Sequence, residues 1–176
     1  GTVAAGLRLH AAVDRDNLLI KVPATQAGLV AIEQLIGAGV SVNVTLMFSL
    51  VHVDQVARAY QRGLEACLAS GGDLSRVYSV ASLFLSRVDT LVDKQLDEIG
   101  GAALPLRGRS ALALARLAHA RYRDRFHGPD FAGLRNQGAR PQYMLWASTG
   151  TKNPAYSDLL YVEPLIGPET VNTLPG

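Results

Sequence analysis

The residue whose surroundings most suggest chemistry is Lys21, which stands in the short apolar run Leu-Leu-Ile-Lys-Val-Pro over positions 18–23. Removing an ammonium from water disfavours its charged form, and a neutral lysine amine is the nucleophile that forms a Schiff base with a ketone. A lysine at a strand end more often simply points to solvent. From spacing alone, Lys21 is therefore a candidate nucleophile with a plain surface lysine as the alternative.

Two polar side chains, Asn43 and Thr45, interrupt the next apolar run, residues 40–48. Because alternate residues of a strand share a face, we expect the valines and Leu46 to face helices, and Asn43, Thr45 and Met47 to face the opposite side. Asn43 and Thr45 could hydrogen-bond a substrate hydroxyl or a catalytic water. They could equally be polar groups that satisfy each other inside the fold.

Ser82 and Arg87 end the third apolar run and could hold a phosphate, because arginine offers a rigid fork of hydrogen-bond donors. The alternative is an exposed arginine paired with Asp89 or Asp93 at the start of a helix.

Ser148 and Lys152 belong to the polar loop Ser-Thr-Gly-Thr-Lys-Asn-Pro, which suits an anion but could also be a plain turn.

We expect no metal site in this chain. The four histidines all fall on helices or their ends, and no two of them have metal-ligand spacing. Cys67 has apolar neighbours on a helix and is expected in the core. A lone cysteine cannot form an internal disulfide, which favours a reducing compartment and hence the cytoplasm.

Alternating strands and helices must position these candidates. Strands are expected over 18–23, 40–48, 77–84, 142–148 and 170–174, and helices over 3–13, 26–36, 51–69, 88–99 and 110–126. Such alternation implies parallel strands with crossover helices. Polar groups gather at the carboxyl ends of the strands, where (β/α)8 barrels place their active sites. A doubly wound sheet is the alternative, but the chain lacks a glycine-rich phosphate loop. We predict a single α/β domain of the TIM-barrel type over residues 1–176.

Composition excludes several classes of protein. The 176 residues are 48% apolar and 18% charged, which is too apolar for a disordered chain. A net charge of +2 gives no reason to expect nucleic acid or an acidic membrane surface. No apolar stretch approaches the roughly 18 residues of a membrane span, and residues 1–6 do not resemble a signal peptide. A cytoplasmic globular protein is the expectation.

Four segments of the sequence, taken together, resemble the transaldolases, and most of all the longer bacterial branch of that family. They are residues 19–25 around Lys21, 43–49 around Asn43 and Thr45, 80–89 around Ser82 and Arg87, and 146–158 around Ser148 and Lys152. The similarity runs in order over essentially the whole chain.

The resemblance implies a cofactor-free, metal-free Schiff-base enzyme of the pentose phosphate pathway. It would move a dihydroxyacetone unit from sedoheptulose 7-phosphate or fructose 6-phosphate to glyceraldehyde 3-phosphate or erythrose 4-phosphate. Lys21 would be the Schiff-base lysine. Thr45 would help to position the catalytic water, with Asn43 beside it.

The same resemblance makes Ser82, Arg87 and Ser148 substrate and phosphate contacts. Shorter family members carry an arginine two positions after the last serine. Gly150 stands there in this chain, so Lys152 is the nearest cation of the loop.

The family takes its acid and base from an aspartate on the first strand and a glutamate on the third, and neither has a counterpart here. Asp14 and Asp16 precede the Lys21 strand, and Asp89 matches neither position. A complete barrel needs about 250 residues, so we interpret the chain as a transaldolase fragment with about strands four to eight. The alternatives are a non-catalytic fragment that binds a sugar phosphate or a partner, and a fructose 6-phosphate aldolase. Open sheet edges lead us to expect self-association of the isolated chain, with no prediction of its oligomeric state.

Overall fold

The computed structural model describes residues 1–174 and contains one five-stranded sheet in the order β1-β2-β3-β4-β5. The strands are β1 Ile20–Pro23, β2 Val42–Met47, β3 Ser79–Phe84, β4 Tyr143–Ala147 and β5 Thr170–Asn172. All neighbouring pairs are parallel. The predicted α/β fold is confirmed, since parallel strands in sequential order, joined by helices, are the arrangement of part of a (β/α)8 barrel.

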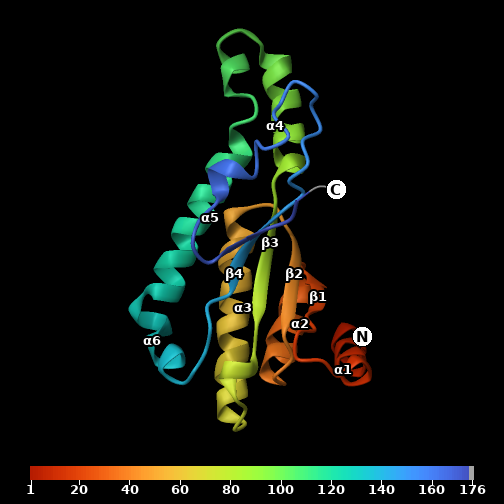
Figure 1. Cartoon of the computed structure of the whole chain (residues 1–176), viewed down its shortest axis with the longest axis vertical. Coiled ribbons are helices and arrows are strands. Elements are labelled where there is room, and N and C mark those ends of the chain that lie inside the picture. Colours follow the sequence, from red (N-terminus) through yellow and green to blue (C-terminus); the bar gives the residue numbers. More distant parts are fainter. Residues whose placement is uncertain (175–176) are drawn as a thin grey trace.

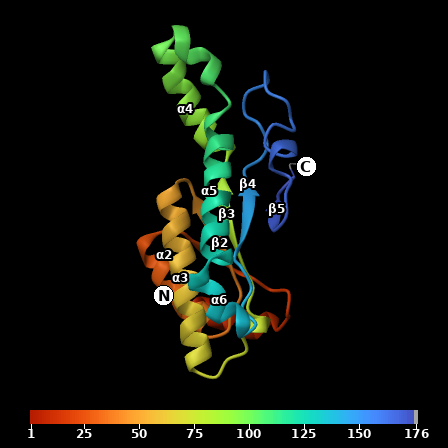
Figure 2. The same ribbon diagram turned by 90° about the vertical axis from the view of Figure 1, so that its left-hand side faces the viewer.

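Six α-helices and three short 3-10 helices accompany the sheet in the described residues (Figure 1). They are α1 Thr2–Val13, α2 Gln26–Gly37, α3 Leu50–Ala69, α4 Ser86–Ile99, α5 Ser110–His127, α6 Pro129–Asn136, η1 Leu74–Arg76, η2 Gly101–Leu106 and η3 Glu163–Leu165. Helices α2, α3 and α5 lie on one side of the sheet (Figure 2). Helix α4 and η2 project beyond the carboxyl end of β3 (Figure 1). No helix among residues 1–174 is long and apolar enough to cross a membrane.

The two faces of the sheet differ in burial. Side chains toward the helices, such as Val22, Val44, Leu83 and Trp146, are buried. On the other face, the strand register aligns Lys21 with Asn43, Asn43 with Val80, and Val80 with Tyr143. Lys21 and Tyr143 are exposed and the two residues between them are half-buried. In the described chain this second face is therefore open to solvent.

The end of β2 departs from the expected alternation. Leu46 has a positive φ of 62° and its side chain is 40% exposed, whereas Met47 is fully buried. The register with β3 shifts between Val44 and Met47, because one extra residue of β2 is accommodated there. Such a bulge reverses the direction of the side chains that follow it. The expectation that Leu46 would face the helices and Met47 the opposite side is therefore wrong.

Helix α2 is fixed closely against the end of β1. The Thr25 side chain caps the helix by accepting a hydrogen bond from the amide of Gly28 at 3.0 Å. A Cβ atom on Gly28 would lie 1.8 Å from the carbonyl oxygen of Pro23, so only glycine fits there. This close approach sets the position of the strand that carries Lys21.

Helix α6 was not expected from the sequence. It is eight residues long and begins with Pro129, a residue that suits the first helical turn. Its buried Phe131 packs edge-on against Phe126 of α5, with ring centroids 5.0 Å apart.

Candidate active site

The predicted nucleophile, Lys21, lies on the open face of β1, between Ile20 and Val22, which point into the core. Its side chain is exposed, so the expectation of a lysine withdrawn from water is not met in the described chain. The reason is geometric, because the apolar run buries the alternate residues and leaves Lys21 on the uncovered face. Lys21 can therefore be reached by a ketone from solvent.

A polar pair lies beside Lys21 on the neighbouring strands. Asn43 is the register partner of Lys21 on β2, and the Ser82 hydroxyl of β3 donates a hydrogen bond to Asn43 Oδ1 at 3.0 Å. This contact occupies the amide oxygen and leaves the Asn43 Nδ2 donors for the oxygen of a ligand. Three of the predicted site residues thus share one face across three strands.

Thr45 follows two residues after Asn43 and is almost completely buried. It pairs with Pro23, and its carbonyl accepts the amide of Ala24 at 2.8 Å. Thr45 therefore lies closer to the carboxyl end of the sheet than Lys21. The left-handed Leu46 comes directly after it.

Arg87 lies exposed in the first turn of α4, with its guanidinium carbon 5.2 Å from the centre of the Phe84 ring. The Phe84 ring in turn contacts Phe48 at 5.3 Å between centroids. The alternative of an Arg87 paired with Asp89 or Asp93 is wrong in this structure. Both carboxylates are engaged elsewhere, and Arg87 forms no ion pair with a residue among 1–174.

Ser148 is hydrogen-bonded to Ser86, the first residue of α4. It has a positive φ of 54°, its carbonyl accepts the amide of Ser86 at 3.0 Å, and the two hydroxyls are 2.8 Å apart. A left-handed serine is uncommon and such strain is often found at functional sites. Lys152 lies four residues further along the loop and is exposed. The structure therefore joins Ser148 to the Arg87 helix through Ser86.

Sequence reasoning missed Ser86 and two carboxylate–tyrosine pairs next to it. Burial raises the pKa of Asp89, which accepts a hydrogen bond from the Tyr161 hydroxyl at 2.6 Å. Burial, then the hydrogen bond to Asp93, raises the pKa of Tyr156 to about 12. A signal was available, because Ser86, Asp89 and Asp93 follow the three- and four-residue spacing of one helix face.

The groups brought together are an amine, a carboxamide, hydroxyls and exposed cations. None of the five strands carries a carboxylate. Among residues 1–174, no cluster of three histidine, cysteine, aspartate or glutamate side chains could hold a metal ion. The arrangement can form a Schiff base and contact a phosphorylated ligand. An acid or base for proton transfer must come from a water or from another part of a larger site.

The family model described as transaldolase/fructose-6-phosphate aldolase matches residues 1–176. The transaldolase of Thiobacillus denitrificans is 57% identical over 176 residues, which cover 99% of this chain and 49% of that protein. The transaldolase of Mycolicibacterium smegmatis is 54% identical over 175 residues, which cover 99% of this chain and 47% of that protein. Transaldolase 1 of Streptomyces coelicolor is 54% identical over 175 residues, which cover 99% of this chain and 46% of that protein. The chain thus spans about half the length of these relatives. From the match over its whole length, the chain belongs to the transaldolase/fructose-6-phosphate aldolase family.

Proposed function

We propose that the protein containing this chain is a transaldolase that uses Lys21 as its Schiff-base nucleophile. It transfers a dihydroxyacetone unit from sedoheptulose 7-phosphate or fructose 6-phosphate to glyceraldehyde 3-phosphate or erythrose 4-phosphate. The proposal is supported by membership of the transaldolase/fructose-6-phosphate aldolase family and by relatives that are named transaldolase. The observation that carries it is the row Lys21, Asn43 and Ser82 on one face of adjacent strands.

The proposed reaction begins with attack of the neutral Lys21 amine on the ketose carbonyl. Loss of water gives an iminium, which accepts the electron pair of the C3–C4 bond as that bond breaks and the C4 hydroxyl loses its proton. The aldose phosphate leaves, and a three-carbon enamine stays on Lys21. The enamine attacks the acceptor aldehyde, the new oxyanion takes up a proton, and water hydrolyses the iminium to free the amine.

Asn43 and Thr45 are proposed to act on oxygen atoms in these steps. The Nδ2 donors of Asn43 lie on the strand next to Lys21 and suit a substrate hydroxyl. Thr45, further toward the carboxyl end, is proposed to position the water that exchanges protons with the intermediates. Because none of the five strands among residues 1–174 carries a carboxylate, we infer that water, or a carboxylate outside the described residues, acts as the acid and base.

Ser82, Arg87, Ser148 and Lys152 are proposed to bind the remainder of the substrate. The exposed guanidinium of Arg87, free of ion pairs with the described residues, can accept a phosphate in a bidentate manner. Sugar phosphates are thus the proposed small-molecule partners, and the low net charge argues against nucleic acid. The buried thiol of Cys67, the chain's one cysteine, favours a cytoplasmic protein. Residues 1–176 are proposed to form one partial barrel domain.

Two other functions make different predictions. A fructose 6-phosphate aldolase releases free dihydroxyacetone without an acceptor, whereas a transaldolase turns over only when an acceptor aldehyde is supplied. A non-catalytic domain binds the sugar phosphate and releases nothing. The family description itself includes both enzymes, so the acceptor requirement is the feature to measure.

The experiment uses fructose 6-phosphate labelled in its first three carbons, with and without erythrose 4-phosphate. A transaldolase moves the label into a seven-carbon sugar phosphate only when the acceptor is present. Lys21→Arg keeps the positive charge but cannot form the imine, and should abolish transfer. Lys94→Arg is the matched control, because Lys94 lies on α4, away from the sheet. Transfer that survives Lys21→Arg would overturn the proposal.

A further inference from the structure

Three polar residues of α4, Ser86, Asp89 and Asp93, are buried along one side of the helix. Their spacing of three and four residues places them on the same face. Buried polar and charged groups need hydrogen-bond partners, and here the partners come from outside the helix. They belong to residues 108–111, where the chain enters α5, and to the segment 148–161, which follows β4.

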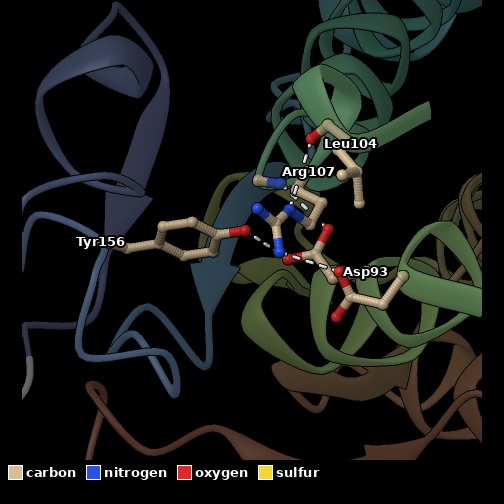
Figure 3. Close-up of polar contacts among 6 residues, drawn as sticks. Asp93, Leu104, Arg107 and Tyr156 are labelled. Atoms are coloured by element: carbon tan, nitrogen blue, oxygen red, sulfur yellow. Dashed lines mark hydrogen bonds and ion pairs between the residues drawn. The ribbon is translucent and has the colours of Figure 1, made fainter. Parts of the chain in front are cut away.

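Asp93 joins both of these segments with its two oxygen atoms. Oδ1 accepts the amide of Gly108 at 3.0 Å, and Oδ2 accepts the hydroxyl of Tyr156 at 2.6 Å. Figure 3 shows the Tyr156 ring extending from its loop toward the Asp93 carboxylate, beside Arg107. Arg107 itself contacts Asp97 at 2.8 Å, and so does not compete for Asp93.

Asp89 repeats the pattern one helical turn earlier. Oδ1 accepts the amide of Ala111 at 2.7 Å, in the first turn of α5, and Oδ2 accepts the buried Tyr161 hydroxyl at 2.6 Å. Each carboxylate thus ties the loop after β4 to α4 and, at the same time, to α5 (Asp89) or to the turn just before α5 (Asp93). The two tyrosine hydroxyls are protonated donors at neutral pH, as tyrosines ordinarily are, and burial raises the pKa of both further.

We propose that Ser86, Asp89 and Asp93 are positioning residues that hold segment 148–161 against α4 and thereby assemble one phosphate-binding site from two parts of the chain. Arg87 comes from the helix, while Ser148 and Lys152 come from the loop. Lys152 lies between the tie at Ser148 and the tie at Tyr156, so its backbone is anchored on both sides. The inference deepens the proposed function and rests on it for the identity of the ligand.

Proteolysis tests the anchoring without any substrate. Trypsin can cleave after Lys152 only when the segment opens locally. Tyr156→Phe removes the hydroxyl that binds Asp93, and we expect cleavage after Lys152 in the intact chain to become about tenfold faster, because a hydrogen bond to a charged group is lost. Tyr122→Phe is the matched control, since it removes a similar bond to Glu169, 2.7 Å long, outside this segment. Equal cleavage rates in wild type and Tyr156→Phe would overturn the anchoring.

Protection by ligand tests the positioning. Fructose 6-phosphate should slow cleavage after Lys152 in the wild type, whereas unphosphorylated fructose should not. The concentration that gives half protection should rise about tenfold in Tyr156→Phe and stay unchanged in Tyr122→Phe. A wild type without protection, or a Tyr156→Phe variant with the wild-type half-protecting concentration, would overturn the positioning role.

The two proposals fail in different ways. If fructose 6-phosphate protects Lys152 but Lys21→Arg does not affect transfer, the proposed nucleophile is wrong and the phosphate site stands. If Lys21 is required for transfer but Lys152 is never protected, the proposed function stands and the positioning inference is wrong. Asp93→Asn adds an independent variant, because it keeps an oxygen for the Gly108 amide and weakens only the charged contact; it should behave like a milder Tyr156→Phe.

Discussion

Gly28 gives the sharpest test of how the fold positions Lys21. In Gly28→Ala, the new methyl would lie 1.8 Å from the Pro23 carbonyl oxygen and 3.1 Å from Thr25 Oγ1. The first of these contacts must lengthen by more than 1 Å to reach the 3.0 Å below which real Cβ atoms essentially never come. The neighbour is backbone, so either α2 or the end of β1 has to move.

The expected cost follows from two contributions. Overpacking of a tight site costs about 1–3 kcal/mol, and loss of the Thr25 cap costs about 0.5–2 kcal/mol. The two contributions sum to about 1.5–5 kcal/mol. Because both arise from the same displaced turn, the loss in free energy of unfolding should not exceed this sum. The displacement lies two residues from Lys21, so the substitution should also impair Schiff-base formation.

Gly133→Ala is the matched control for this prediction. Gly133 lies within α6, and a Cβ atom there would meet nothing within 4 Å. The same substitution should therefore stabilise the chain by roughly 0.5–1 kcal/mol, through helix propensity. Urea unfolding of both variants, followed by circular dichroism, gives the comparison. A Gly28→Ala variant within about 0.5 kcal/mol of wild type would refute the reasoning on the β1–α2 contact.

Further predictions concern strain, charge and the open face. Leu46→Gly should raise stability by about 1 kcal/mol in urea unfolding, because it relieves the left-handed conformation; a loss of stability would contradict this. Burial raises the pKa of Asp89, so the native state binds more protons there and stability should fall as pH rises above the ordinary aspartate pKa. Asp89→Asn should make the free energy of unfolding less dependent on pH in this range. An unchanged pH dependence in the variant would contradict the role of Asp89. Arg87→Lys should weaken fructose 6-phosphate binding about tenfold, since a lysine lacks the bidentate fork, with no change in urea midpoint. Sedimentation of the isolated chain should show self-association through its open sheet face and edges; a monodisperse monomer would argue otherwise.

The strands and most helices could be predicted because their signals are local. Apolar runs bounded by glycine, proline and polar turns mark the strands, and alternation predicts that Asn43 faces away from the helices, where the structure pairs it with Lys21. Ser82, also a predicted site residue, lies on the same face, and its hydroxyl donates a hydrogen bond to Asn43, 39 positions away in the sequence.

Other features depend on contacts that no local pattern reveals. The bulge at Leu46 places a leucine in a conformation that usually favours glycine, so its residue type argues against it. Helix α6 is short and is stabilised by Phe131 packing on α5. The Asp93–Tyr156 and Asp89–Tyr161 pairs join residues 63 and 72 positions apart, and either tyrosine could equally have been a surface residue.

The burial of Lys21 was misjudged for a similar reason. Apolar neighbours in a sequence indicate burial only when both faces of the strand are covered. In the described chain helices cover one face, so Lys21, which lies between Ile20 and Val22 on the other face, is exposed.

The central claim is that Lys21 forms the Schiff base, and borohydride trapping tests it most directly. The chain contains three lysines, Lys21, Lys94 and Lys152, so peptide mapping of the reduced adduct assigns the site without ambiguity. With fructose 6-phosphate we predict a reduced adduct on Lys21: three carbons if the C3–C4 bond is cleaved, six carbons if cleavage needs groups outside this chain. An adduct on Lys94 or Lys152 instead, or none on Lys21 even in a full-length polypeptide that contains this sequence, would contradict the account.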